Sequence, residues 1–128
     1  MRSNLIDWDF RLLLEASTLN DVVDDGFATD QDEQLGLFDQ KKALLATRYE
    51  DFKACMDFFD HRDLCFRRRG INRNWGTSDR MLKIIEQHLG RQISHGALLL
   101  ALDLRGMNLE RIDNRKDVFM GISDRTSL

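Results

Sequence analysis

Four arginines within seven residues form the strongest candidate for binding chemistry in this chain. Arg67, Arg68 and Arg69 are followed by Arg73, in a stretch that also holds asparagine and tryptophan. A guanidinium group pairs with phosphate oxygens through parallel hydrogen bonds, and side-chain amides add directional ones. Attraction to the carbonyl groups at a helix end would explain one or two arginines. Four favour contact with a phosphate backbone.

The residue types that usually carry catalysis or bind metals do not form a recognisable motif. Asp57 and His61 could share a helical face, but solvated helix charges explain such a pair. The spacings of Cys55, His61 and Cys65 match no zinc signature. The sequence has no phosphate-cradling glycine loop and no Gly-x-Ser-x-Gly nucleophile elbow. We therefore expect a protein that is not an enzyme, that holds no metal and no cofactor, and that acts by binding.

The size and composition of the chain predict one ordinary domain. It has 128 residues, of which 42% are apolar, and this is enough for a single hydrophobic core. No apolar run approaches the 18 or so residues of a membrane span, and the first residues lack the apolar core of a signal peptide. The two cysteines fall in a helical stretch, so reduced thiols are expected. These observations predict a cytoplasmic protein without a membrane partner.

Charge is distributed unevenly along the sequence. Residues 1–40 hold two basic and ten acidic side chains, a net charge of −8, whereas residues 41–128 hold 17 basic and 12 acidic side chains, a net charge of +5. A basic body suits contact with nucleic acid, and the acidic front would then be a partner surface or an autoinhibitory arm. Ordinary solvated faces are the alternative explanation.

The front of the chain predicts a helical arm and a linker. Apolar residues with helical spacing extend over residues 5–19 and indicate one amphipathic helix. Residues 21–34 are rich in acids without regular apolar spacing, and they predict a loop in which Val22, Val23 and Phe27 could be anchors. The predicted division is an acidic arm and linker over 1–34 and a helical core over 35–128, in one compact domain overall.

An apolar residue recurs every seventh position in the middle of the chain. A seven-residue repeat is typical of a helix that packs lengthwise on another helix. We expect one long helix, or two with a break near Thr47 or Asp60. The face is either the core of the single chain or the seam of a homodimer. The repeat runs through Phe38, Leu45, Phe52, Phe59 and Phe66, and the predicted dimer seam consists of the first four.

The last third of the chain predicts two helices with a tight turn between them. Helical spacing begins after Thr77 and ends at Gly90, which suits the left-handed position after a helix. Ser94 can cap a second helix, which Gly106 ends. Glycine at the turn is the feature that permits a sharp reversal between the helices.

Two segments with alternating polarity follow, residues 107–110 and 118–122, with a polar turn between them. Their period of two predicts a β-hairpin, so the fold class is mainly α with a small C-terminal hairpin. This order of helix, turn, helix and hairpin resembles the winged helix-turn-helix domain. The resemblance implies a DNA-binding regulator of transcription or a protein-binding scaffold, with the first helix of the module supplied by residues 52–66.

The second helix of this module departs from the pattern because it is apolar nearly all round. A recognition helix needs polar side chains to read base edges. We therefore expect contact with the phosphate backbone of double-stranded DNA rather than readout of bases. The predicted contacts are Arg67, Arg68, Arg69, Arg73, Arg91, Ser94, His95, Arg115 and Lys116.

A second hypothesis follows from a faint likeness to small phage and mobile-element proteins. It is carried by the run Ser-His-Gly-Ala-Leu-Leu at 94–99 and by the closing strand at 118–123. It implies an inhibitor or adaptor that binds a basic protein surface through the acidic front. The predicted partner-binding residues are Asp21, Asp24, Asp25, Asp30, Asp32 and Glu33.

Overall fold

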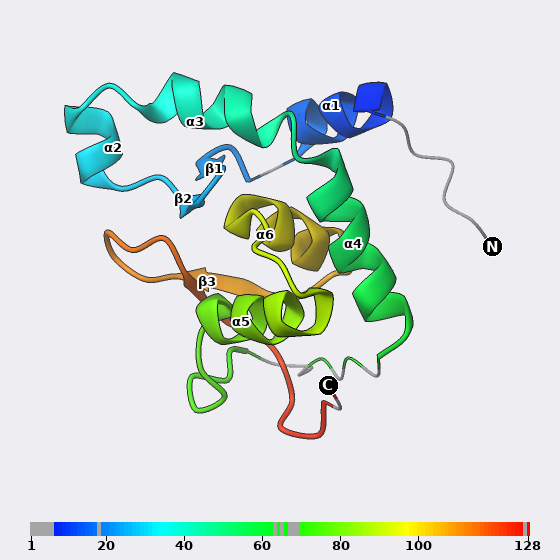
Figure 1. Cartoon of the computed structure of the whole chain (residues 1–128). Coiled ribbons are helices and arrows are strands. Elements are labelled where there is room, and N and C mark those ends of the chain that lie inside the picture. The colour runs from blue at the N-terminus through cyan, green and yellow to red at the C-terminus, as the bar shows by residue number, and fades with distance from the viewer. Residues whose placement is uncertain (1–6, 18, 63, 65, 67–69, 127) are drawn as a thin grey trace.

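The computed structural model describes residues 7–17, 19–62, 64, 66, 70–126 and 128. These residues are mainly helical, with two short antiparallel strand pairs (Figure 1). The elements in chain order are α1 (Asp7–Ala16), β1 (Val22–Val23), β2 (Gly26–Phe27), α2 (Asp30–Gln34), α3 (Phe38–Leu45), α4 (Tyr49–Asp60), α5 (Ser78–Leu89), α6 (His95–Leu104), β3 (Leu109–Arg111) and β4 (Val118–Met120).

Helix α6 is the centre of the molecule. Every residue from His95 to Leu102 is buried, as expected for a helix that is apolar on all sides. In Figure 1, α4 and α5 lie beside and below this helix, and the strand pair β1–β2 lies above it. Gly96 is required at the upper contact, because a Cβ atom there would lie 2.0 Å from the carbonyl oxygen of Val23.

The seven-residue repeat forms the core of the single chain. Leu45, Phe52 and Phe59 are buried, and α4 packs along α6. This placement corrects the prediction of a dimer seam at these three residues, since a side chain already covered by its own chain cannot contact a second copy. The fourth member, Phe38, is partly buried. The predicted break near Thr47 is present, because α3 ends at Leu45 and α4 begins at Tyr49.

The acidic front of the chain belongs to the same core. Phe10, Val22 and Phe27 are buried in one cluster with residues of α4, α5 and α6. The expected anchors in the linker are therefore core residues, and residues 19–34 do not form a separate arm. Helix α2 begins with a capping box in which Thr29 and Asp32 each bond the backbone of the other.

The C-terminal order of elements agrees with the predicted one. Thr77 caps α5, and Gly90 ends it with a left-handed φ of 73°. Ser94 caps α6 by accepting the N–H of Ala97 at 3.1 Å. The hairpin pairs Leu109 with Met120, Glu110 with Phe119 and Arg111 with Val118. The mainly helical fold with a C-terminal hairpin is thus confirmed, and none of its described helices has the length and apolar character of a membrane crossing.

Candidate nucleic-acid interface

The loop of residues 70–76, which carries Arg73, is fixed by one buried amide. Asn72 is only 2% exposed. Its side-chain nitrogen donates to the carbonyl oxygen of Ile122 at 3.0 Å and to a carboxylate oxygen of Asp124 at 2.8 Å. Its side-chain oxygen accepts the N–H groups of Asn74 and Trp75 at 3.1 and 3.3 Å. The first two bonds hold the loop against the C-terminal segment and the other two fix its internal turn, so the side chains that it presents are positioned in advance.

Trp75 lies beneath an arginine rather than on the surface. Trp75 is 7% exposed and belongs to the hydrophobic core cluster. The guanidinium carbon of Arg80 lies 4.2 Å from the ring centroid, and Nη1 of Arg80 donates to the carbonyl oxygen of Trp75. Gly76 leaves room for the arginine stem, since a Cβ atom there would lie 3.2 Å from Cδ of Arg80. The result is a cation held over an aromatic ring.

Arg73 is also held in place, but by a carboxylate. Its Nη2 atom lies 2.6 and 2.8 Å from the two carboxylate oxygens of Glu110, and its Nε atom also donates to Glu110. Its guanidinium carbon lies 5.9 Å from the ring centroid of Phe119, which pairs with Glu110 across the hairpin. The Arg73 side chain is 63% exposed. It can therefore meet a ligand, although Glu110 neutralises part of its charge.

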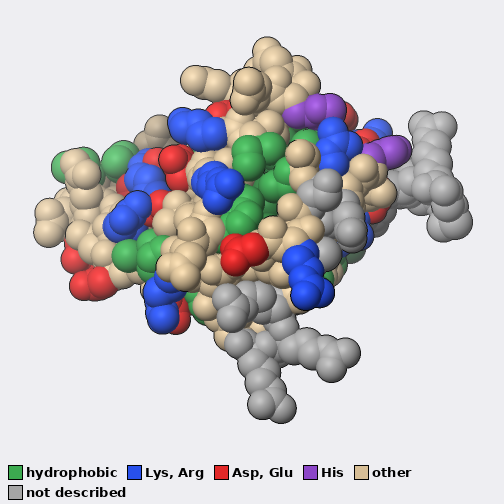
Figure 2. All heavy atoms as spheres, turned by 90° about the horizontal axis from the view of Figure 1, so that it is seen from below, with side chains coloured by type: hydrophobic (Ala, Val, Ile, Leu, Met, Phe, Trp, Pro, Cys, Tyr) green, Lys and Arg blue, Asp and Glu red, His purple; other side chains and the backbone are tan. Residues whose placement is uncertain are grey.

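Helix α5 adds two exposed cations that the sequence analysis did not select. Arg80 and Lys83 are three residues apart on the helix, so they share one face. Lys83 has no ion pair or hydrogen bond to any described side chain, and Arg80 has no acidic partner among them. Figure 2 shows Lys and Arg side chains distributed around an apolar strip on the lower face of the molecule. We call the surface of Arg73, Arg80 and Lys83 the lower basic face.

The arginine run itself, Arg67, Arg68 and Arg69, lies outside the described residues. Its role in phosphate contact stays a prediction from sequence. Arg73 is the one member of the predicted cluster that the structure places, and it lies on the lower basic face.

Two predicted contacts of α6 are buried and already bonded. Ser94 accepts the N–H of Ala97 and donates to the carbonyl oxygen of Asp24 at 2.7 Å. His95 shares a hydrogen bond of 2.8 Å with the hydroxyl of Ser78, and burial lowers the pKa of its imidazole. Both residues are thus largely buried and bonded within the chain, although they line a pocket of about 480 Å³ beside Arg48, so their contact with phosphate stays a prediction.

Three further predicted cations bind carboxylates of the same chain. Arg91 contacts Asp51 at 2.7 Å. Arg115 donates to both oxygens of Asp117, at 2.9 and 2.7 Å. These ion pairs reduce the charge that each cation could offer to a phosphate group. The third cation, Lys116, belongs to a larger network.

That network joins the acidic front to α3 and to the hairpin. Asp25 and Asp32 both bind Lys41, at 3.0 and 2.5 Å, and both bind Lys116, at 3.0 and 3.1 Å. Burial alone would raise the pKa of Asp32, which is 3% exposed, but the bonds from Lys41, from the Thr29 N–H and from Lys116 hold this pKa well below its ordinary value. The four side chains therefore fasten three segments together.

The remaining predicted acidic contacts divide into two groups. Asp24 binds Arg48 at 2.8 Å, and Asp21 binds Arg111 at 3.0 Å. With Asp25 and Asp32, these residues have cationic partners inside the chain, and this reduces the charge that they could offer to a partner protein. Of the four, Asp32 is buried, whereas the side chain of Asp21 is 61% exposed. Asp30 and Glu33 are exposed on α2, and among the described residues neither carboxylate forms an ion pair.

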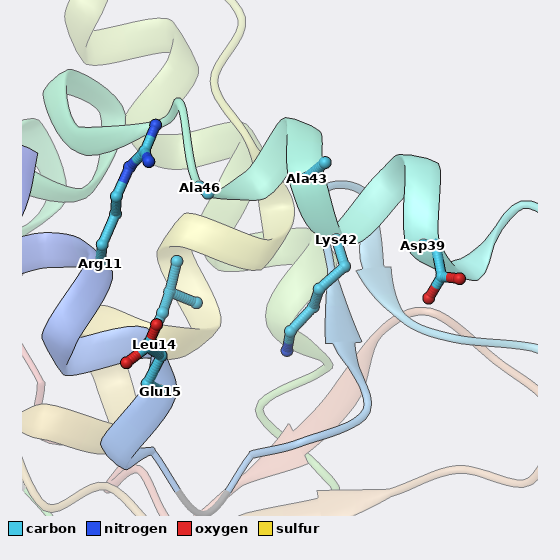
Figure 3. Close-up of a pocket in the computed structure, with 7 residues that line it drawn as sticks. All are labelled: Arg11, Leu14, Glu15, Asp39, Lys42, Ala43 and Ala46. Atoms are coloured by element: carbon cyan, nitrogen blue, oxygen red, sulfur yellow. The ribbon is translucent and has the colours of Figure 1, made fainter.

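A pocket of about 450 Å³ opens between α1 and α3 (Figure 3). In Figure 3 the side chain of Lys42 turns from α3 toward β1, where its Nζ donates to the carbonyl oxygens of Asn20 and Val22. Its ammonium group is thus committed to the backbone, and burial lowers its pKa. The pocket is lined by Arg11, Leu14, Glu15, Asp39, Lys42, Ala43 and Ala46. Because both acidic and basic side chains line this pocket, it favours no single class of ligand.

The described residues include no cluster of metal ligands, and the cysteine among them is buried. No group of three or more His, Cys, Asp or Glu side chains among them converges on a point that could hold a metal ion. Burial raises the pKa of the Cys55 thiol to about 12, so this cysteine is protonated and a poor nucleophile.

Comparison of the chain with models of known protein families, with curated proteins and with solved structures found no match.

Proposed function

We propose that this protein is a non-enzymatic nucleic-acid-binding protein, a DNA-binding regulator of the cytoplasm, which contacts the phosphate backbone with its lower basic face. The observation that carries the proposal is the pair Arg80 and Lys83, two exposed cations without an acidic partner among the described residues. Asn72 fixes the neighbouring loop, so the loop would lose little conformational entropy when a ligand binds.

The winged helix-like order of α4, α5, α6 and the hairpin is, in this proposal, a scaffold. Helix α6 corresponds to the recognition helix of such a domain, and its side chains from His95 to Leu102 are buried. They cannot enter a major groove. Affinity would then come mainly from phosphate contacts, would depend steeply on salt and would vary little with sequence.

The experiment is fluorescence anisotropy of a labelled random DNA duplex, titrated with the protein over a series of salt concentrations. Each neutralised phosphate adds about −0.9 to the slope of log K against log salt. The double variant Arg80→Glu, Lys83→Glu should weaken binding at low salt and reduce the slope by about 2. Arg11→Glu is the matched control, because Arg11 is an exposed arginine on α1.

Three outcomes separate the possibilities for this face. An unchanged slope in the double variant would remove the lower basic face from the proposal. Loss of binding only in the triple variant Arg67→Glu, Arg68→Glu, Arg69→Glu would assign the phosphate contacts to the arginine run. Absence of binding at low salt would reject the nucleic-acid proposal as a whole.

A second candidate function is an inhibitor or adaptor that binds a basic protein surface through α2. Asp30 and Glu33 are exposed without ion pairs to described residues, and Leu35, which follows them, is 60% exposed. In such a contact Leu35 would be buried, and the two carboxylates would lie at the polar rim, where they could attract cations of the partner. Under this alternative, Asp30→Lys with Glu33→Lys would abolish function, whereas Arg80→Glu with Lys83→Glu would be tolerated.

A further inference from the structure

We infer that the lower basic face takes a single strand of DNA or RNA in preference to a duplex. This inference rests on the proposed function and names the class of nucleic acid that the same face would bind. Its basis is Arg80 over the ring of Trp75, with the exposed Lys83 three residues further on the same helix, and Arg73 near Phe119 in the loop that leads to this helix.

The first step is that the usual groove-reading elements of a winged helix are occupied. Helix α6 is buried, as described above. The tip of the hairpin is bonded to the acidic front: the carbonyl oxygen of Lys116 accepts the N–H of Phe27 at 3.0 Å, and Oδ1 of Asn114 accepts the N–H of Asp30 at 2.8 Å. A duplex would therefore meet the cations of α5 without the recognition-helix equivalent α6 or a free hairpin tip to enter either groove.

The second step is the geometry of Arg80. Its guanidinium group packs over the buried ring of Trp75, while the arginine as a whole is exposed. The guanidinium carbon lies 4.2 Å from the ring centroid, so the indole supports the cation, while the residue keeps contact with solvent. Unpaired bases stack on guanidinium planes, as they do on aromatic rings, and every base has such a face. In a duplex these faces are already stacked on one another.

The third step is the position of the second arginine, Arg73. Arg73 lies on the other side of the loop, fixed by Glu110 and close to the ring of Phe119. Its partly neutralised charge makes it a weak phosphate anchor but leaves its planar group fixed at the surface. Two arginines held near aromatic rings, with the exposed Lys83 on the helix of Arg80, suit a strand whose bases stack while Lys83 meets a phosphate.

The test compares labelled nucleic acids of equal length in the anisotropy assay at one salt concentration. The probes are a homothymidine strand of about 20 nucleotides, a homouridine strand of the same length, and the duplex of homothymidine with homoadenine. We expect both single strands to bind about tenfold more tightly than the duplex. Duplex binding that equals or exceeds strand binding would overturn the inference and leave the proposed function in place. Failure of all three probes would reject both.

The two single strands also identify the sugar that the face prefers. Equal affinity for homothymidine and homouridine supports recognition by stacking and charge alone. A large preference for uridine would assign RNA as the ligand through its 2′-hydroxyl group. Both results keep the single-strand inference, because both place the strand above the duplex.

Arg80→Lys isolates the stacking contribution, because lysine keeps the positive charge and lacks the planar group. We expect this variant to lose about fivefold in affinity for the single strands and less than twofold for the duplex. Equal losses on strand and duplex would mean that Arg80 acts only as a charge, and the inference would fail. Lys83→Arg and Arg11→Lys are the matched controls, and circular dichroism should be unchanged in all three variants.

Discussion

The acidic front and the lower basic face use charge in opposite ways. Asp21, Asp24, Asp25 and Asp32 all bind cations of the same chain, so the charge of the front is largely neutralised where the chain folds on itself. On the lower face, Arg80 and Lys83 lack such carboxylate partners among the described residues. The difference shows that a local excess of charge in a sequence does not identify a binding surface, since pairing decides which charges remain available.

Burial explains why the front must be paired. A carboxylate that loses its water shell is stable only with compensating charges or hydrogen bonds, and Asp32 has both. Arg80 keeps much of its hydration while it packs on Trp75, so no carboxylate is needed there. Charged side chains of the front therefore stabilise the fold. On the lower basic face, Arg80 and Lys83 have no carboxylate partner among the described residues, whereas Arg73 binds Glu110.

The largest expected effect comes from breaking the contact that holds the front on α6. Gly96→Ala places a methyl group 2.0 Å from the carbonyl oxygen of Val23, and neither backbone can move without disturbing the core. We expect a loss of about 4 kcal/mol or more in the free energy of unfolding, or no folded protein. Urea denaturation followed by circular dichroism measures it, with the exposed Gln87→Ala as control. A stable variant would show that β1 can detach from α6.

The next effect separates paired from unpaired carboxylates within the front. Asp32→Asn should lower the free energy of unfolding by about 2–4 kcal/mol, because Lys41 and Lys116 lose a common partner in a buried place. Glu33→Gln, on the next residue, should change it by less than about 0.5 kcal/mol. Urea titration measures both variants. Equal losses of stability would contradict the distinction between paired and unpaired carboxylates.

A smaller loss of stability is expected from a change in the loop that carries Arg73. Asn72→Ala removes the amide that bonds the loop on both sides, and it should cost about 2 kcal/mol of stability. Binding of a labelled strand should weaken as well, because Arg73 and Trp75 lose their fixed positions. Asn74→Ala changes an exposed asparagine of the same loop and should leave stability unchanged. If Asn72→Ala bound nucleic acid as the parent protein does, a preformed loop would be irrelevant to the face.

The smallest expected effect is the pH dependence of the front. The pKa of Asp32 is lowered in the folded protein, so its contribution to stability is complete above the ordinary carboxyl pKa of about 4 and is lost as the pH falls toward the folded value. The pKa of Asp117 is shifted in the same direction because the bonds from Thr77 and Arg115 outweigh its burial. Between pH 6 and pH 3, Asp32 alone should account for a loss of about 1 kcal/mol.

Thermal unfolding measured at several pH values isolates this contribution. The slope of stability against pH below about pH 4 should be smaller in Asp32→Asn than in the parent protein. An identical slope in both proteins would mean that Asp32 titrates alike in the folded and unfolded chains, contrary to its ion pairs with Lys41 and Lys116.

Local signals in the sequence predicted the C-terminal half of the fold well. Thr77, Gly90 and Ser94 set the limits of α5 and α6 because capping and left-handed turns depend on neighbouring residues only. The alternation around the polar turn likewise predicted the hairpin. The β1–β2 pair was missed since strands of two residues have no periodicity, although Asp25-Gly26 after two valines was a usable turn signal.

Properties that depend on distant residues could not be predicted. The repeat through Leu45, Phe52 and Phe59 indicates an apolar helix face, but it is the same whether the covering helix comes from this chain or from a second copy. The partners of Lys116 lie about 90 residues away, at Asp25 and Asp32, so the sequence alone could not tell that its charge is neutralised. Arg80 and Lys83 were overlooked because a pair of cations on a helix is common.

The central position of α6 also has a consequence for synthesis on the ribosome. Val22, Leu45 and Phe52 are made long before residues 95–104, which form the last of the described helices and cover them. Until α6 has left the exit tunnel, these apolar side chains lack that cover, although Phe52 can already pack on Phe10, with 5.1 Å between the ring centroids. We therefore expect that the nascent chain stays partly unfolded, with exposed apolar side chains, through most of translation. It should bind chaperones and complete its folding in one late step.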